Sequence, residues 1–327
     1  MSFQAYRVSQ EGDQIKGHVC DIDFNDLTSG EVLIEAHFSS INYKDALAGT
    51  GRGKIMKSLP LIGGIDVSGV VVESTDKRFI KGENVLVTGY DLGVGHDGGY
   101  AHFVRVPADW VVKVPANLSL NDAMVVGTAG FTAALAIFRL EQNLLNKNMG
   151  KVVVTGATGG VGSLAIEFLH HLGYEVTAIT GKKSESDYLK LLGAKEVWVR
   201  GEFEMGERPL EKALWAGAID TVGSGVLAWL TRTVNTHGSI ASCGLAAGID
   251  LHTTVMPFIL RGINLLGIDS VACPMKTRLE VWHRIANTMK PDQFKTSIKV
   301  ITLNELNSVF EQMMNGKTIG RYVVKIK

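Results

Sequence analysis

The sequence predicts an α/β protein in two parts, a curled, mainly antiparallel β domain followed by a doubly wound parallel sheet. Short β patterns fill the first 120 residues, and strand and helix patterns alternate from Lys151 onward. A glycine-rich turn follows the first strand of that alternation. At 327 residues with 46% hydrophobic content, the chain is long enough for two domains with substantial cores.

Composition narrows the class of protein. The chain carries 33 basic and 33 acidic residues, which argues against nucleic acid or an anionic membrane as its main partner. Its three cysteines, Cys20, Cys243 and Cys273, are widely spaced, which fits a reducing cytosol better than a disulfide framework. We see no signal-peptide pattern and no apolar run of about 18 residues, so we expect a cytoplasmic protein without a membrane span.

The first part is built from β patterns. Five segments punctuated by Gly, Asp and Asn have strand character, namely residues 31–38, 67–74, 84–90, 101–106 and 110–115. Residues 119–141 then carry helical apolar spacing, and Ser119 with Asp122 predicts a capping box at the start of this helix.

The second part alternates between strand and helix. We expect strands at 151–155, 175–180, 196–199, 218–222 and 239–244, with helices at 161–173 and 185–193 between the first three. The last stretch, residues 301–327, reads as strand, helix and strand, and we expect it to rejoin the first domain.

The turn VTGATGGVG (154–162) has the pattern of a phosphate-binding loop. Ala157, Gly159 and Gly162 occupy the three places of a G-x-G-x-x-G fingerprint between a strand and a helix. A pyrophosphate needs close approach to the backbone, and a helix N-terminus meets its charge. We therefore predict a dinucleotide site here, with a merely tight strand-to-helix turn as the alternative.

The end of the next strand selects the cofactor. An NAD enzyme places Asp or Glu about 20 residues after the fingerprint, where it binds the ribose 2′-hydroxyl. Here Thr180, Gly181 and Lys182 fill that place and the first acid is Glu185, so the sequence favours NADPH with its 2′-phosphate. Arg200, after the following strand, is a second candidate partner for that phosphate. The alternative for the lysines at 182 and 183 is a solvated surface.

Asp66 is unexpected in the segment PLIGGIDVSGVVV (60–72), which otherwise reads as a buried turn and strand. A buried carboxylate has to be paired, hydrogen-bonded or neutralised. The arrangement of the two parts resembles the medium-chain dehydrogenase/reductase superfamily, in which many members hold catalytic zinc. Under that resemblance the ligand positions fall at Asn42, Ile65 and Thr128, none of which is a usual zinc ligand. We therefore predict no metal, and we expect Asp66 to pair with polar groups lining the same pocket.

The resemblance is sharper in six segments, residues 39–47, 64–71, 127–136, 155–163, 208–223 and 253–262. They look like the zinc-independent YhdH/AcuI-type quinone oxidoreductases, whose characterised members are NADPH-dependent acrylyl-CoA reductases. The resemblance implies a GroES-like catalytic domain at 1–123 and 266–327 and a Rossmann NADPH-binding domain at 124–265. Thr180 and Lys182 stand where some members have Ser and Arg, and both pairs suit a 2′-phosphate.

The resemblance also implies roles for individual residues. The expected catalytic set is Asn42, Tyr43, Asp45 and Asp66, which form a polar cluster at the nicotinamide with Tyr43 lying against the cofactor. The other expected cofactor contacts are Thr128, Gly159, Gly160, Val161, Gly162, Thr180, Gly181, Lys182, Arg200, Leu245, Ile259, Ser270 and Arg321. Simpler alternatives are a helix cap made by Asn42 and Asp45, and a core position for Tyr43.

The reaction implied is conjugate reduction of a small 2-enoyl-CoA, with acrylyl-CoA giving propanoyl-CoA. Hydride from NADPH adds to the β-carbon, and Tyr43 or water protonates the resulting enolate at the α-carbon. NADPH:quinone oxidoreduction is the alternative, since both substrates are electron-poor conjugated carbonyls. Arg52, Lys54 and Lys57 are candidates for the phosphates of CoA, with a solvated loop as the alternative.

Two further expectations concern partners. Relatives often pair their nucleotide domains, so we expect a homodimer. Some zinc-independent relatives act as RNA-binding or structural proteins, which is an alternative of another class. The zero net charge and the lack of a basic stretch interleaved with aromatics argue against it.

Overall fold

The structure, a computed structural model, describes residues 2–291 and 297–327 and divides into two compact units. The first unit comprises residues 2–128, Val271–Ala286 and Ser297–Lys327. The second comprises Ala129–Ser270 and residues 287–291.

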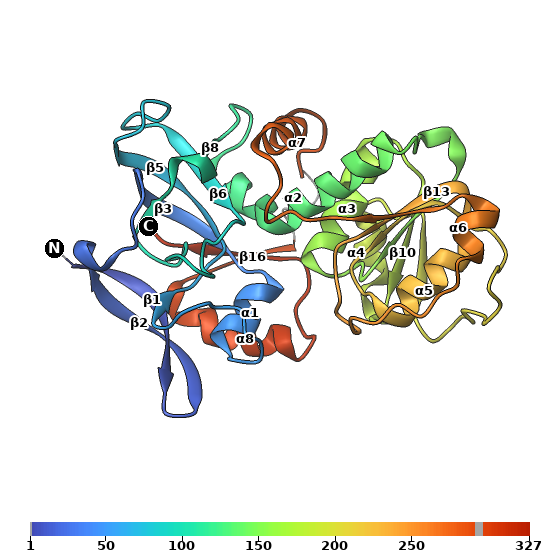
Figure 1. The fold of residues 1–327 in the computed structure, drawn as a ribbon, viewed down its shortest axis with the longest axis horizontal. Coiled ribbons are helices and arrows are strands. Elements are labelled where there is room, and N and C mark those ends of the chain that lie inside the picture. Colours follow the sequence, from blue (N-terminus) through green and yellow to red (C-terminus); the bar gives the residue numbers. More distant parts are fainter. Residues whose placement is uncertain (1, 292–296) are drawn as a thin grey trace. The chain divides into compact units, whose positions relative to one another are not determined.

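The first unit is built on two β-sheets (Figure 1). The larger sheet has the order β15 (Ile298–Ile301), β16 (Arg321–Lys325), β3 (Val32–Ser40), β5 (Asp66–Ser74), β6 (Asn84–Thr88) and β8 (Val112–Lys113), with β7 (Phe103–Val106) also paired to β3. The smaller sheet has the order β2 (Gln14–Asp23), β1 (Ser2–Glu11) and β4 (Leu61–Ile62). Only β15 and β16 pair in parallel among the described strands of this unit. The predicted mainly antiparallel β domain is confirmed, and β16 brings the C-terminal stretch next to β3.

The helices of the first unit are α1 (Tyr43–Gly49), α8 (Leu306–Met314) and most of α7 (Met275–Thr288). Helix α2 (Leu120–Gln142) begins in this unit and continues into the second. The predicted capping box is present at its start, because Ser119 N donates to Asp122 Oδ2 (3.1 Å) and Asp122 N donates to Ser119 Oγ (3.0 Å).

Helix α2 is the one helix among the described residues that is long and apolar enough to cross a membrane by length and composition. However, 83% of its most apolar window is buried inside the fold. The core helix of a globular protein passes the same test, so this helix is weak support for a membrane span.

The second unit is a six-stranded parallel sheet covered by helices (Figure 1). Its strand order is β11 (Glu196–Val199), β10 (Val176–Thr180), β9 (Val152–Thr155), β12 (Trp215–Asp220), β13 (Val234–Ser242) and β14 (Asn264–Gly267). The helices are α3 (Gly160–His171), α4 (Ser186–Leu191), α5 (Ser224–Thr233) and α6 (Met256–Arg261). The chain runs outward from β9 to β11 and then resumes at β12 on the other side of β9, which is the doubly wound order of dinucleotide-binding folds. The predicted parallel sheet is confirmed.

The sequence explains why β9 and β10 lie inside this sheet. Every residue of VVVT and of VTAIT is buried, as expected for central parallel strands covered on both faces. A separate cluster of aromatic residues, Trp198, Phe203, Trp215 and Trp229, packs within the core of the same unit.

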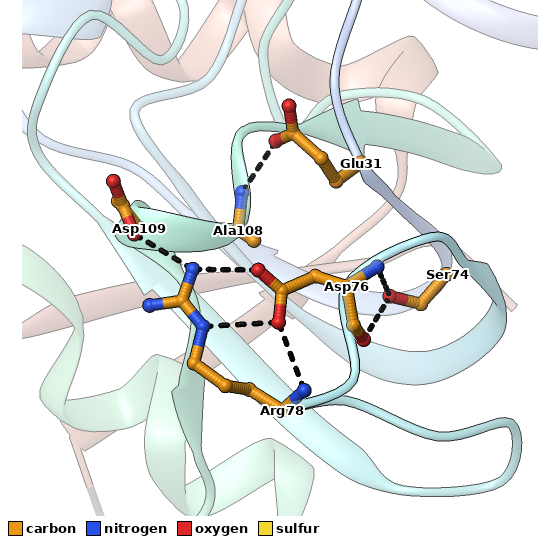
Figure 2. Close-up of polar contacts among 6 residues, drawn as sticks. All are labelled: Glu31, Ser74, Asp76, Arg78, Ala108 and Asp109. Carbon is orange, nitrogen blue, oxygen red and sulfur yellow. Dashed lines mark hydrogen bonds and ion pairs between the residues drawn. The ribbon is translucent and has the colours of Figure 1, made fainter.

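One corner of the first unit is tied together by charged side chains at its surface (Figure 2). Arg78 donates to both oxygens of Asp76 (3.0 and 2.8 Å) and to Asp109 (2.7 Å). The hydrogen bonds from Arg78 lower the pKa of Asp76 to about 2. Arg78 is largely exposed, so these ion pairs contribute little to stability and serve mainly to fix the turn between β5 and β6.

Candidate active site

A buried carboxylate organises a polar cluster in the first unit. Asp66 is the first residue of β5, and none of its surface is exposed. Its Oδ2 accepts hydrogen bonds from Ser40 Oγ (2.6 Å), Asn42 Nδ2 (2.8 Å) and the backbone N of Thr128 (2.9 Å). Its Oδ1 accepts from Thr128 Oγ1 (2.5 Å). Four donors therefore compensate the lost hydration of this carboxylate.

Asp45 is the second carboxylate of the cluster. Its Oδ2 accepts from Asn42 N (2.8 Å) and Asn42 Nδ2 (3.2 Å), and its Oδ1 accepts from Ile65 N (3.0 Å). Asn42 is the N-cap of α1 and forms a capping box with Asp45. The same hydrogen bonds therefore cap the helix and belong to the polar cluster. Burial, together with the charge of Asp66, raises the pKa of Asp45 to about 7.

Arg321 supplies the opposite charge. It lies on β16 with 2% of its surface exposed. Its guanidinium donates to Ser40 Oγ (2.8 Å) and to the carbonyls of Ile41 (2.9 Å) and Val125 (2.9 Å). Burial lowers the pKa of Arg321, against the opposing effect of the two aspartates. The structure thus places Arg321 inside the polar cluster, with its donors committed to protein groups.

Gly127 is a residue of this cluster that the sequence analysis missed. It interrupts α2 with φ +49° and ψ −157°. A Cβ at this position would lie 2.6 Å from Asp66 Oδ2, 2.6 Å from Ser40 Oγ and 2.7 Å from Arg321 Nη2. Only glycine allows the chain to pass this close and still present the N–H of Thr128 to Asp66. The segment GTAGFT held the signal, but only as one glycine among several.

Tyr43 differs from the residues of the polar cluster because its side chain is exposed. It begins α1 and is 46% exposed, which excludes the core position considered as an alternative. Among the described contacts, no hydrogen bond involves its hydroxyl. The side chain is thus available to a ligand.

The residues at the zinc positions do not fit a metal. Asn42 donates its amide to two carboxylates, Ile65 is a buried aliphatic side chain, and Thr128 is bound to Asp66. In the part of the chain that the structure describes, no group of three or more His, Cys, Asp or Glu side chains is arranged to hold a metal ion. A zinc site needs thiolate, imidazole or carboxylate ligands in a tetrahedral set.

The glycine-rich turn of the second unit has the geometry of a phosphate cradle. Gly159 is the exposed N-cap of α3, and Gly160 and Val161 form its first turn. A Cβ at Gly162 would lie 2.5 Å from the carbonyl oxygen of Gly156, so only glycine lets the helix pack this close to the turn. Unpaired amides at the start of α3 suit an anionic pyrophosphate.

The end of β10 carries basic groups where an NAD enzyme has an acid. Thr180 ends β10, and its Oγ1 accepts from Lys182 N (2.9 Å). Arg200 lies over Gly181, since a Cβ there would be 3.2 Å from Arg200 Nη2. Within the described residues no carboxylate pairs with Arg200, whereas Lys183 pairs with Glu202 (2.7 Å). The geometry brings Thr180, Gly181, Lys182 and Arg200 together.

Three other expected cofactor residues lie elsewhere in the second unit. Leu245 is 58% exposed and follows β13, close to Gly223. Ile259 is on α6 and is 71% exposed. Ser270 accepts a hydrogen bond from Thr132 Oγ1 (2.8 Å). The first two are apolar side chains open to a ligand or a partner.

The basic loop after α1 is less free than its sequence indicates. Arg52 pairs with Glu311 (2.8 Å) and Lys57 pairs with Asp91 (2.8 Å). Lys54 is exposed and takes part in no ion pair among the described residues. A CoA phosphate at this loop would have to compete with two carboxylates.

The sequence analysis also missed a buried network at the ends of β9 and β12. Asp220 is completely buried and accepts hydrogen bonds from Thr155 Oγ1 (2.6 Å) and Gly223 N (2.9 Å). Burial raises the pKa of Asp220, and these hydrogen bonds act in the opposite direction. The motif AIDTVG contained these residues, but the pairing with Thr155 spans 65 positions.

The doubly wound sheet with its glycine cradle and the β unit with its buried polar cluster define a class, the medium-chain dehydrogenases and reductases. Residues 28–116 match the family "Alcohol dehydrogenase GroES-like domain", and residues 160–287 match the family "Zinc-binding dehydrogenase". The chain belongs to the medium-chain dehydrogenase/reductase superfamily. The resemblance drawn from the sequence is confirmed.

Particular relatives are similar over nearly the whole chain. "Putative quinone oxidoreductase YhfP" of Bacillus subtilis is 47% identical, with 99% of both chains covered. "Probable acrylyl-CoA reductase AcuI" of Escherichia coli is 46% identical, again with 99% of both covered. The crystal structure of the Salmonella enterica yhdH oxidoreductase in complex with NADP has a TM-score of 0.97 at 47% identity, covering 99% of this chain and 100% of that chain. The crystal structure of Bacillus subtilis yhfP with NAD bound has the same TM-score and identity, with 99% of both covered.

Proposed function

We propose that this chain is an NADPH-dependent reductase that converts acrylyl-CoA, or a similar small 2-enoyl-CoA, to the saturated thioester. The observation that supports this most is the 46% identity, over 99% of both chains, to a relative named as an acrylyl-CoA reductase. The preference for NADPH over NADH has separate support. At the end of β10, Lys182 and Arg200 stand where an NAD enzyme has an acidic residue.

The second unit provides the cofactor residues. We assign the pyrophosphate to Gly159, Gly160, Val161 and Gly162, and the 2′-phosphate to Thr180, Gly181, Lys182 and Arg200. We assign Leu245, Ile259 and Ser270 to the remaining cofactor contacts in this unit. The bound NADPH would supply the hydride for the reaction.

The first unit provides the residues that orient the reacting groups. Asp66 fixes the Thr128 hydroxyl, and Asp66 with Asp45 fixes the Asn42 amide, so both polar groups stay in one orientation. Arg321 holds Ser40 and balances the charge of the two carboxylates. We assign Asn42 and Thr128 to contacts at the nicotinamide end, and Tyr43 or water to protonation of the α-carbon. Catalysis by this set is positioning and electrostatic stabilisation.

NADPH:quinone oxidoreduction is a second candidate function. The relative of Bacillus subtilis with 47% identity is named as a putative quinone oxidoreductase. Both reactions use the same cofactor residues and an electron-poor conjugated carbonyl.

A product assay tests the proposed function. The protein is incubated with acrylyl-CoA and NADPH deuterated at the transferred position, and the thioester is analysed by mass spectrometry. We expect propanoyl-CoA carrying one deuterium at its β-carbon. Failure to form this product, together with rapid NADPH oxidation by a benzoquinone, would favour the second candidate.

We also propose a cytoplasmic, zinc-independent homodimer that binds neither nucleic acid nor membranes. Apolar side chains support a dimer contact on the second unit, because Leu260 on α6 (60%) and Ile249 (81%) and Val255 (68%) in the segment before it are exposed. Strand β14 pairs only with β13 among the described strands, which leaves one edge open. Light scattering with Leu260→Glu tests the dimer, with Leu144→Glu as the control because Leu144 is even more exposed (76% against 60%) and lies outside α6. A dimer disrupted only by the first variant supports it.

A further inference from the structure

The place where the strand order of the second unit reverses holds a second set of polar residues. Strands β9 and β12 are neighbours there, and in doubly wound sheets ligands bind beyond the carboxyl ends of the strands at this reversal. The backbone pairing of the two strands runs from Val152–Gly217 to Val154–Ile219. At the next residues, Thr155 and Asp220, the two strands are joined by side-chain hydrogen bonds.

These contacts join the two strand ends tightly. Thr155 Oγ1 donates to Asp220 Oδ1 (2.6 Å) and accepts from Thr221 N (3.1 Å). Thr221 Oγ1 donates to the carbonyl oxygen of Thr155 (3.0 Å). Thr155 and Asp220 are completely buried, so water does not compete for these hydrogen bonds.

Asp220 also holds the turn that follows β12. Its Oδ2 accepts from Gly223 N (2.9 Å) and its Oδ1 from Val222 N (3.3 Å). Gly223 is the N-cap of α5 and has φ +76°. One carboxylate therefore links the end of β9 to the turn before α5.

The glycine-rich turn packs against Thr221. Gly156 follows Thr155 directly and has φ +58°. A Cβ at Gly156 would lie 2.1 Å from Thr221 Oγ1, so Thr221 fills the space beside the turn. The position of the phosphate cradle thus depends on Thr221, which Thr155 holds in place.

We infer that Asp220, Thr155 and Thr221 are positioning residues for the dinucleotide, because they fix the distance between the glycine-rich turn and the turn before α5. This inference rests on the proposed NADPH binding. The three residues support the glycine-rich turn, which we assign to the pyrophosphate that NADPH and NADH share. Loosening them should therefore weaken both cofactors alike, unlike a change at the 2′-phosphate.

The test is direct measurement of NADPH and NADH dissociation constants for Thr155→Val, with Thr233→Val as the matched control. Thr233 is also a buried threonine of this unit, and its hydroxyl donates to the carbonyl of Trp229 (3.0 Å) within α5. Both variants lose one buried hydroxyl, and Thr155→Val should lose more thermal stability because it also removes a donor to the buried Asp220 carboxylate, so affinities are compared at a temperature where both proteins are folded. We expect Thr155→Val to raise both dissociation constants about tenfold, and Thr233→Val to leave both within about twofold.

Two conservative variants sharpen the result. Thr155→Ser keeps the hydroxyl and should restore both affinities. Thr221→Val should also weaken the binding of both cofactors, and it replaces Thr155→Val in the test if that variant does not fold. Equal affinities for Thr155→Val and Thr233→Val, with the wild type binding NADPH, would overturn the inference alone. A wild-type protein that binds no NADPH would instead overturn the proposed function.

Discussion

Asp66 accepts both hydrogen-bond donors of Thr128, the hydroxyl at 2.5 Å and the backbone N–H at 2.9 Å. Helix α2 is interrupted at Gly127, and the backbone N–H of the next residue donates to Asp66. The Asp66 carboxylate thus joins strand β5 to helix α2 inside the first unit, as does the hydrogen bond from Ser68 Oγ to the carbonyl oxygen of Leu120 (2.7 Å).

Asp66→Asn should lower kcat while the protein stays folded. An amide has one acceptor oxygen and one NH2 group, so it cannot accept from all four donors of Asp66. We expect kcat to fall about tenfold, which corresponds to about 1.4 kcal/mol of barrier, with NADPH affinity retained.

Asp66→Leu is the contrasting variant. It leaves buried donors without partners, so it should reduce the free energy of unfolding by about 1–3 kcal/mol or more. Suppose that Asp66→Asn melts many degrees lower while its folded fraction turns over at the normal rate. The carboxylate would then be a structural cap on β5 and nothing more.

Gly127→Ala should destabilise the protein much more than its small size indicates. The new Cβ would lie within 2.7 Å of Asp66, Ser40 and Arg321, and all three are buried. Gly12→Ala is the matched control, because Gly12 has a similar φ of +62° with nothing within 4 Å of its Cβ position. We expect the control to lose about 1 kcal/mol in urea unfolding and Gly127→Ala to lose several times as much. Equal losses would show that the close approach is relieved at no cost.

Arg200→Ala should weaken NADPH binding selectively. The guanidinium lies over Gly181 without a carboxylate partner among the described residues, so it is free to bind a 2′-phosphate. We expect a loss of about 1.5–3 kcal/mol for NADPH and no change for NADH, and the same pattern for Lys182→Ala. Lys183→Ala is the control, because Lys183 already pairs with Glu202. Equal affinity of the wild type for the two cofactors would contradict the assignment.

Asp45 should make stability depend on pH in an unusual direction. Its pKa is about 7 in the folded protein, against a reference value of about 3.9 for an unfolded chain. Between about pH 4 and 7 the folded state therefore holds a proton that the unfolded state has released, and this contribution to stability decreases as pH rises. Urea unfolding of wild type and Asp45→Asn across this range should show the wild-type advantage shrinking with rising pH. Parallel curves would mean that the carboxyl group is ionised throughout.

Much of the second unit was predictable from the sequence because its signals are local. The run VVVT, the glycines after it and the helix that follows lie within 20 residues, and each has a distinct period or turn residue. The positions of Lys182 and Arg200 could be predicted in the same way, because each follows a strand with a clear local pattern.

The polar cluster could be predicted only in part because its contacts are long-range. Asn42, Asp45 and Asp66 were recognised through family resemblance, but the bond from Arg321 to Ser40 spans 281 positions. Gly127 required knowledge of its φ and of three side chains from other elements. Asp220 was missed for the same reason, because the residue that makes its charge tolerable is on another strand.

Reduction of a small enoyl-CoA is tested most directly by kcat/KM for NADPH oxidation, measured in parallel with acrylyl-CoA, crotonyl-CoA and a benzoquinone. We expect the highest value for acrylyl-CoA and a lower value for crotonyl-CoA with its added methyl group. Asp66→Asn should lose the same fraction of its rate with all three substrates. A benzoquinone with the highest kcat/KM, or turnover that Asp66→Asn leaves unchanged, would contradict these expectations.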